Sequence, residues 1–238
     1  GAGQGRWSEL LAPGNSMRGR TLVGVGLQFF QQVSGINAIM FFAPELFARY
    51  LTAGGALNGA LVVNALNHAA TYIAVVLVDR AGRVVLLVSS GLLMAMCLLL
   101  AAVLTTVDSH SDTTGFALIG LSCGFVVAFA YGWGPLAWTV CAEIFPLRLR
   151  GKATSVTTAV NWASATAVGL LFPLASSESA MGLAGTFAVF AGCCLAGAAM
   201  VQVCLPETAN SSLEDVDDIF AAHKRTIFRR FWAKPPNR

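Results

Sequence analysis

The sequence predicts an all-α, polytopic membrane protein with six transmembrane helices. Of its 238 residues, 56% are hydrophobic and 11% are charged, whereas soluble domains contain about 25% charged residues. Six apolar runs are each long enough to cross a hydrocarbon core of about 30 Å, which takes about 20 helical residues. Lys and Arg residues also gather in alternate connections between these runs. Because so few charges cannot cover a water-exposed surface of this size, we expect lipid to be the solvent for much of the chain.

Polar connections separate the predicted spans. Asp79–Arg83 lies between the second and third spans, Asp108–Asp112 between the third and fourth, and Arg148–Lys152 between the fourth and fifth. Ser176–Glu178 separates the last two, and the chain turns polar after Pro206. In chain order, the six spans are Thr21–Phe47, Leu57–Val78, Val84–Val107, Gly115–Ala142, Ala153–Leu174 and Gly182–Leu205.

Basic residues predict the orientation of the chain in the membrane. With six spans, both ends lie on one side, and that side receives every Lys and Arg residue except Arg49. Because Lys- and Arg-rich loops stay in the cytoplasm, we expect both termini to be cytoplasmic. Residues 1–20 then form a cytoplasmic segment, residues 21–205 the transmembrane domain, and residues 206–238 a cytoplasmic tail.

No residue pattern predicts a cofactor, a metal site or a nucleic-acid surface. The six cysteines lie inside apolar runs and lack the CxxC or Cys/His spacing of metal ligands. The formal net charge is only +3, and no basic helix carries the interleaved aromatic residues of a phosphate-tracking surface. We therefore expect no cofactor, no bound metal and no nucleic-acid partner.

The first span carries five polar side chains within ten residues: Gln28, Gln31, Gln32, Ser34 and Asn37. At 100° per residue the three glutamines fall within about 100° of arc. Asn37 joins their face only if the helix bends or unwinds near Ser34 and the glycine that follows it. Transporters line binding sites with such interrupted helices, and a carboxamide offers a polyol both donors and an acceptor without charge. This cluster favours a polar pathway over simple helix–helix hydrogen bonding.

Two other spans carry candidate ligand-binding residues. In the second span Asn67 is the candidate ligand, and His68 is interpreted as a neutral packing histidine. In the fourth span Tyr131 and Trp138 share one face, and the two glycines and Pro135 between them weaken the helix unless neighbouring helices compensate. An indole offers a flat apolar surface and one hydrogen-bond donor, so Trp138 is predicted to contact the ligand.

The remaining spans differ in polarity. The fifth span has a ridge of Thr, Asn and Ser side chains between Thr154 and Ser164, for which close helix packing and pore lining both remain open. The third and sixth spans have no Asn, Gln or charged residue in their middles. Because polar groups at depth are costly unless they face a bundle interior or water, these two spans are expected to face lipid.

Five motifs occur in the order and spacing of one family: Gln31–Asn37, Asp79–Arg83, Gly134–Trp138, Glu143–Arg150 and Pro206–Thr208. The chain resembles the sugar porter family of the major facilitator superfamily from about Arg18 to Phe220, and is similar to fungal, plant and algal hexose transporters. The resemblance implies helices seven to twelve of that family, which is one half of a bundle built as a 3+3 inverted repeat. Residues 1–20 would end the central loop, and the partner would be a missing amino-terminal half, since the chain opens with Gly1.

The resemblance also implies roles for individual residues. The expected contacts with a monosaccharide are Gln31, Gln32, Asn37, Asn67 and Trp138. The expected extracellular aromatic gate is Phe41 and Phe42. The expected cytoplasmic charge cluster is Asp79, Arg80, Arg83, Glu143 and Arg150. Ala130 and Ala165 depart from the Glu and Asn of glucose facilitators, so sugar preference cannot be carried over.

These features predict a plasma-membrane carrier, not an enzyme, that moves a hexose by alternating access. Proton-coupled symport is the prediction, and facilitated uniport or a non-transporting sugar sensor are the alternatives. Glu45 lies near the outer end of its span, so a carboxylate that couples protons would have to lie in the missing half. An intramembrane serine protease built on Ser34 and His68 is a remote alternative that leaves the amide array unexplained.

Overall fold

The chain folds into helices throughout the part that the structure describes. The computed structural model describes residues 5–12, 17–107, 111–208 and 220, with residues 73–80 described by their backbone alone. Within these ranges there is no strand, so the predicted all-α class is confirmed. After a short 3-10 turn, η1 (Trp7–Leu10), the helices are α1 (Met17–Val33), α2 (Ile36–Phe47), α3 (Ala53–Ala81), α4 (Arg83–Val107), α5 (Asp112–Tyr131), α6 (Trp133–Ile144), α7 (Leu147–Ala175) and α8 (Gly182–Cys204).

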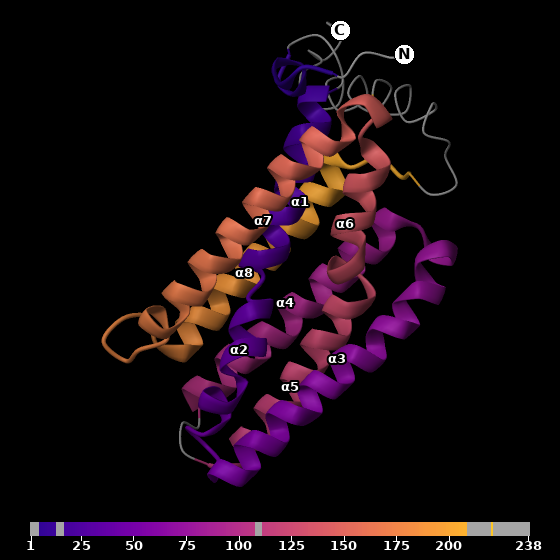
Figure 1. Ribbon diagram of the computed structural model, residues 1–238. Coiled ribbons are helices and arrows are strands. Elements are labelled where there is room, and N and C mark those ends of the chain that lie inside the picture. Colours follow the sequence, from indigo (N-terminus) through magenta and orange to yellow (C-terminus); the bar gives the residue numbers. More distant parts are fainter. Residues whose placement is uncertain (1–4, 13–16, 108–110, 209–219, 221–238) are drawn as a thin grey trace, which may run out of the picture.

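These helices pack into an elongated bundle (Figure 1). When α1 with α2 and α5 with α6 are each counted as one interrupted span, the helices α1 to α8 make six spans. Among the described residues, four stretches are long and apolar enough to span a membrane as they stand: α4, α5 with α6, α7 and α8. The first predicted span is instead divided between α1 and α2, which have 17 and 12 residues. The second predicted span lies within α3. The chain thus keeps the expected six-crossing topology, but two of its crossings are interrupted helices.

The first interruption lies where the helix had to bend or unwind for Asn37 to join the glutamine face. Gly35 separates α1 from α2 with φ of 90°, in the left-handed region, which a residue with a Cβ rarely adopts. A Cβ at this position would also lie 2.5 Å from the ring of Phe190 in α8. The backbone turn and this close approach both require glycine, so the break is built into the sequence.

The second interruption lies at Gly132, between α5 and α6. A Cβ on Gly132 would overlap the side chain of Ser90 in α4. The backbone at Gly132 therefore approaches α4 too closely for any residue other than glycine. Glycine and proline weaken the predicted fourth span here, and the sequence left open whether the helix continues. The structure ends α5 at Tyr131 and starts α6 at Trp133.

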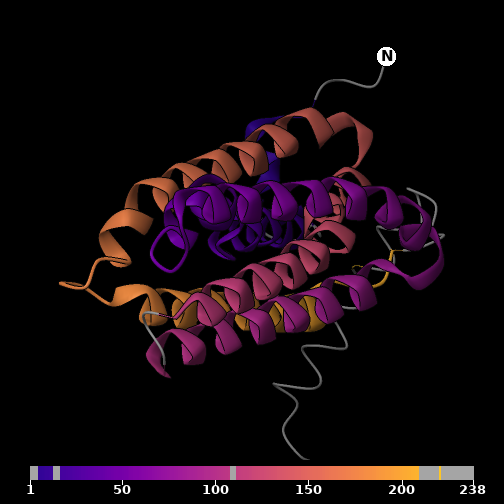
Figure 2. The same ribbon diagram turned by 90° about the horizontal axis from the view of Figure 1, so that it is seen from below.

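The helices pack in a way that separates polar from apolar faces. α4 packs against α8 and α5, while α1 packs against α7 and α2 against α3. Figure 2 shows α4, α5 and α8 grouped on one side of the bundle and α7 on the opposite side. Large apolar side chains remain about half exposed on α4 and α8, among them Leu92, Leu99, Val103, Val189 and Leu195. Such faces suit the predicted contact of these two spans with lipid.

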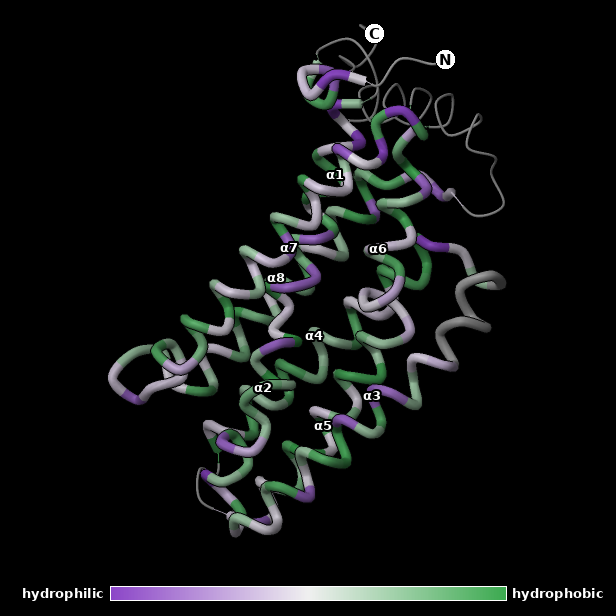
Figure 3. The backbone as a smooth tube through the Cα atoms, in the orientation of Figure 1, coloured by the Kyte–Doolittle hydropathy of each residue, from purple (hydrophilic) through white to green (hydrophobic). Residues whose placement is uncertain are grey.

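The polar end of the bundle is where α1 and α7 begin and α8 ends. Figure 3 shows hydrophilic residues concentrated toward this end and hydrophobic residues along the lengths of the helices. The η1 turn is held on the start of α7 by an ion pair between Glu9 and Arg148 at 2.6 Å. Lys152 Nζ donates to the carbonyl of Gly5 at 2.6 Å and lies 5.5 Å from the ring centroid of Trp7.

Candidate functional site

A network of side-chain carboxamides joins α1, α2 and α7 at the break in the first span. Asn161 on α7 lies at its centre and donates from Nδ2 to Gln28 Oε1 at 2.6 Å and to Gln31 Oε1 at 2.7 Å. Its Oδ1 accepts from Gln32 Nε2 at 3.0 Å. Gln32 Oε1 in turn accepts from Asn37 Nδ2 at 2.7 Å. The break therefore brings Asn37 to the glutamine face, which the sequence allowed only if the helix was interrupted here.

The same network is anchored to the backbone of α6. Gln31 Nε2 donates to the carbonyl oxygens of Trp133 and Gly134 at 2.8 and 2.9 Å. Gln28 Nε2 donates to the carbonyl of Ala137 at 3.3 Å. Since both amides reach the first turns of α6, the network ties together the two interrupted spans and α7.

Burial divides the network into an inner and an outer part. Gln28, Gln31 and Asn161 are at most 2% exposed. The hydrogen bonds described above use most of the donors and acceptors of these three side chains. Gln32 and Asn37 are half-buried, and each has an amide hydrogen not used in a bond between described residues. The network is therefore accessible to a ligand at Gln32 and Asn37. The donors and acceptors that remain there are uncharged and suit hydroxyl groups.

The other expected sugar contacts lie outside this network. Asn67 on α3 is half-buried, and in the described part of the chain its carboxamide makes no hydrogen bond, although its carbonyl accepts from Thr71. Trp138 on α6 is 40% exposed. His68 is exposed and its Nδ1 lies 2.8 Å from the carbonyl of Asn64. Contact of Asn67 and Trp138 with a sugar stays a prediction.

The two expected gate residues differ in environment. Phe41 is 65% exposed. The ring of Phe42 lies 5.2 Å from that of Phe172 in α7, which stacks 6.3 Å from Phe190 in α8. Because Phe190 also packs on Gly35, this aromatic cluster packs against one side of the break in the first span. A gating role for Phe41 and Phe42 stays a prediction.

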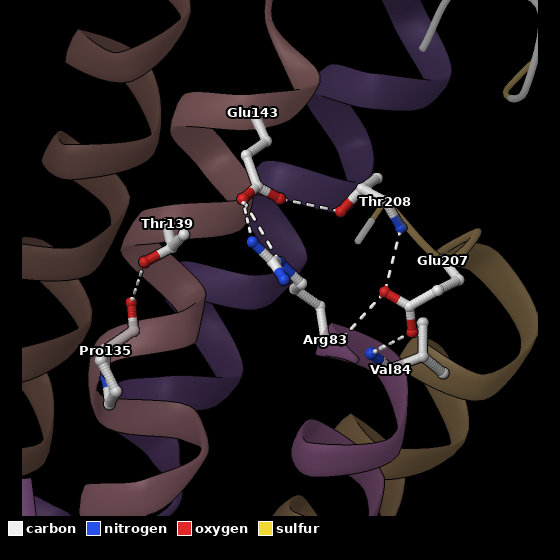
Figure 4. A network of polar contacts seen from close by, with 7 residues as sticks. All are labelled: Arg83, Val84, Pro135, Thr139, Glu143, Glu207 and Thr208. Carbon is white, nitrogen blue, oxygen red and sulfur yellow. Dashed lines mark hydrogen bonds and ion pairs between the residues drawn. The ribbon is translucent and has the colours of Figure 1, made fainter. Parts of the chain in front are cut away.

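A second polar network lies at the end of the bundle where α6 and α8 end (Figure 4). Arg83 Nη2 pairs with Glu143 Oε1 at 3.0 Å, and Thr208 Oγ1 donates to Glu143 Oε2 at 2.8 Å. Glu207 Oε1 and Oε2 accept from the backbone N–H groups of Arg83 and Val84 at 2.9 and 3.1 Å. Glu207 thus caps the amino terminus of α4, where a carboxylate is favoured by the unpaired N–H groups and the helix dipole.

Of the other three members of the expected charge cluster, Arg150 is the one whose side chain lies among the described residues. The side chains of Asp79 and Arg80 lie outside the described residues. Arg150 Nε donates to the carbonyl of Phe145 at 3.1 Å, and its Nη2 is buried without a hydrogen-bond partner among the described residues. The structure therefore assembles the pair of Arg83 and Glu143 and adds two residues that the sequence pattern did not place in the cluster, Glu207 and Thr208.

The centre of the carboxamide network was not decided by the sequence. Asn161 was part of a ridge for which packing and pore lining were both open, and Gln28 was one of three glutamines on a face. The signal for Asn161 is helical spacing: it lies four residues after Thr157 and three before Ser164, so these side chains share one face of α7, and all three are buried. Their partners on α1 follow only from the packing of α1 against α7.

The fold and these two networks define a class: a bundle of membrane-spanning helices, with interrupted helices meeting at a polar centre. Comparisons give the family. The profile of the family described as "Sugar (and other) transporter" matches residues 2–220. The chain belongs to this family, the sugar porters of the major facilitator superfamily.

Several known proteins are similar to this chain over most of its length. The facilitated trehalose transporter Tret1 of Drosophila virilis is 37% identical over 201 residues, which are 82% of this chain and 22% of that protein. The Tret1 protein of Anopheles gambiae is 37% identical over 202 residues, 82% of this chain and 25% of that protein. The chain therefore spans about a quarter or less of these relatives.

Solved structures show the same arrangement of helices. The inward-open xylose transporter XylE from E. coli superimposes with a TM-score of 0.75 and 26% identity, covering 89% of this chain and 44% of XylE. The proton:xylose symporter XylE bound to 6-bromo-6-deoxy-D-glucose gives a TM-score of 0.74 and 28% identity, covering 84% of this chain and 42% of that one. The chain corresponds to less than half of each.

Proposed function

We propose that this chain forms the carboxy-terminal half of a carrier that moves a sugar across a membrane by alternating access. The observation that carries the proposal is that the carboxamide network ends at two half-buried amides, Gln32 and Asn37, each with an amide hydrogen that bonds to no described residue. Half-buried amides beside a helix break can exchange hydrogen bonds with a hydroxyl-rich ligand and return to each other when it leaves. Residues 21–205 would form the transmembrane half, with residues 1–20 and 206–238 in the cytoplasm of a plasma-membrane protein.

The hydrogen-bond inventory supports a neutral polyol as the ligand. Gln32 Nε2 has two hydrogens and gives one to Asn161, and Asn37 Nδ2 gives one to Gln32. Asn37 Oδ1 accepts no bond from a described residue, so together the two side chains offer two donors and an acceptor. No carboxylate belongs to the carboxamide network within the described residues. A hexose is the proposed ligand, with Asn67 and Trp138 closing the site from α3 and α6.

The two ends of the bundle have separate proposed roles. Phe41, which is exposed, and Phe42, which belongs to the aromatic cluster, form the outer gate. Arg83 and Glu143 hold the inner ends of α4 and α6 together, and so favour the outward-facing state. Gating and inner closure would act on access to the site and leave the hydrogen bonds to the sugar unchanged.

The test is sugar uptake by the complete gene product that contains this chain. Gln32→Ala and Asn37→Ala should each raise KM several-fold, because one hydrogen bond contributes about 1 kcal/mol. Asn58→Ala is the matched control, since this exposed amide lies at the start of α3. Unchanged KM for both site variants at normal surface levels would refute the proposed site.

A disaccharide is a second candidate ligand, favoured by the trehalose transporters among the relatives. Competition of labelled glucose uptake by unlabelled trehalose and xylose separates the candidates. Proton symport remains the proposed coupling and facilitated uniport the alternative. Uptake driven uphill by an imposed pH gradient, and abolished by a protonophore, would support symport; downhill exchange that is indifferent to both would support uniport.

A further inference from the structure

Trp133, the first residue of α6, is held in a notch between two outer helices. Its side chain is 2% exposed. A Cβ at Gly91 of α4 would lie 3.0 Å from Trp133 Nε1, and a Cβ at Gly197 of α8 would lie 3.0 Å from Cη2 of the same ring. These distances are closer than a side chain normally tolerates, so both glycines leave the space that the indole fills.

The indole is also fixed by a hydrogen bond. Trp133 Nε1 donates to the carbonyl of Leu87 in α4 at 2.9 Å, in a buried setting. Leu87 itself is fully buried. Because a Trp side chain has only one donor, this bond and the two glycine contacts set both the position and the rotation of the ring. The break between α5 and α6 is thereby pinned to α4.

The backbone of the same residue supports the candidate sugar site. The carbonyls of Trp133 and Gly134 accept the two amide hydrogens of Gln31, at 2.8 and 2.9 Å. With its amide held in this way, Gln31 presents Oε1 to Asn161 at 2.7 Å. Asn161 then accepts from Gln32, the residue at which the network opens.

We propose that Trp133 is a positioning residue for the sugar site: its indole, anchored on α4, holds the two carbonyls that orient Gln31 and, through Asn161, Gln32. This proposal rests on the proposed function, because the anchor acts on the ligand only through Gln31, Asn161 and Gln32. Trp133 has no contact with the ligand in this scheme. Its effect is therefore on sugar affinity, through the geometry of Gln31.

A purely structural role makes a different prediction. A tryptophan that only fills space would, when replaced, lower the amount of folded carrier and leave the affinity of each folded molecule unchanged. A positioning residue changes KM at normal surface levels and leaves kcat almost unaltered. The KM-against-kcat split therefore separates the two roles.

The experiment compares Trp133→Phe and Gly91→Ala in the complete gene product. Trp133→Phe removes the donor to Leu87, and Gly91→Ala presses on Nε1 while the native indole remains. Each should raise KM for sugar roughly five-fold, the effect of about one hydrogen bond, with kcat per surface molecule within about two-fold. The double variant should raise KM little beyond Trp133→Phe alone, because the indole nitrogen on which the added methyl group would press is gone and its 3.2 Å approach to the Cβ of Ala198 is the tight contact that remains. Trp162→Phe is the matched control, since Trp162 on α7 is 65% exposed.

The outcomes are distinguishable from those that test the site itself. If KM stays within about two-fold of the parent in both Trp133→Phe and Gly91→Ala while Gln32→Ala raises it, the positioning role is wrong and the proposed site stands. If Gln32→Ala and Asn37→Ala also leave KM unchanged, the proposed function fails, and the positioning role fails with it. If Trp133→Phe does not reach the membrane, Gly91→Ala decides, because it adds one methyl group beside Trp133 Nε1 and the Cβ of Ala198 and keeps the indole.

Discussion

Replacing Asn161 by alanine should separate the two parts of the carboxamide network. Asn161 holds Gln28 and Gln31 through bonds of 2.6 and 2.7 Å, and these partners are buried. It also holds the half-buried Gln32 through a bond of 3.0 Å. The first two bonds serve the packing of α7 on α1, and the third orients a proposed sugar contact. One substitution therefore has two effects that different assays can measure.

The size of each effect follows from the bonds that are lost. Hydrogen bonds between membrane helices contribute about 0.6 kcal/mol on average, and buried acceptors left without partners cost about 1–3 kcal/mol. Two buried acceptors at about 1–3 kcal/mol each should therefore lower stability by about 2–6 kcal/mol. The bond to Gln32 should contribute about 1 kcal/mol to sugar affinity, which is about five-fold in KM.

The assay measures thermal stability in detergent and the KM of sugar uptake on the same Asn161→Ala preparation. Thr166→Ala is the control, because this exposed hydroxyl on the same helix bonds only to the carbonyl of Trp162 among the described residues. A variant that loses stability with KM unchanged would show that Asn161 serves packing alone. A variant with unchanged stability and unchanged KM would refute the network as the organiser of the site.

Three further predictions follow from the other parts of the molecule. Trp138→Leu should reduce uptake more severely than the loss of one amide, because both the flat ring and its donor disappear; uptake at the parental rate would leave Trp138 as a membrane anchor. Glu143→Gln should shift the carrier toward the inward-facing state and slow turnover, because the ion pair with Arg83 at 3.0 Å weakens; an accessibility assay with an unchanged inward-to-outward ratio contradicts this. The 238-residue chain alone, reconstituted in liposomes, should show no saturable counterflow of labelled glucose, whereas co-expression with an amino-terminal half should restore it, since occlusion needs two walls.

Much of the fold could be predicted because lipid imposes simple rules. Backbone groups in hydrocarbon must bond within their own segment, so long apolar runs had to be helices, and polar connections marked their ends. The break at Gly35 was also predictable: Asn37 could join the glutamine face only if the helix were interrupted there. At Gly132 the sequence held helix-weakening residues, but the close passage of Ser90 that requires glycine at this position belongs to tertiary structure.

The site was only partly predictable for the same reason. Side chains on one helix, such as Gln31 and Gln32, could be grouped by their angular spacing. Asn161 lies on α7, four crossings further along the chain than α1, and no spacing rule joins it to the glutamines. The cap by Glu207 at the start of α4 likewise depends on how the segment after α8 returns to the bundle. Spacing therefore identifies candidates on each helix, and packing selects their partners.

The two breaks are better understood as one structural unit. Gln31 lies just before the break at Gly35, and its amide donates to Trp133 and Gly134, just after the break at Gly132. Each interrupted helix opens one of the two three-span repeats that the family predicts. The points at which the backbone can bend are thus joined by the hydrogen bonds that form the candidate site. A ligand that exchanges bonds with Gln32 would act on a network tied to both breaks, so binding and helix rearrangement would share the same few contacts.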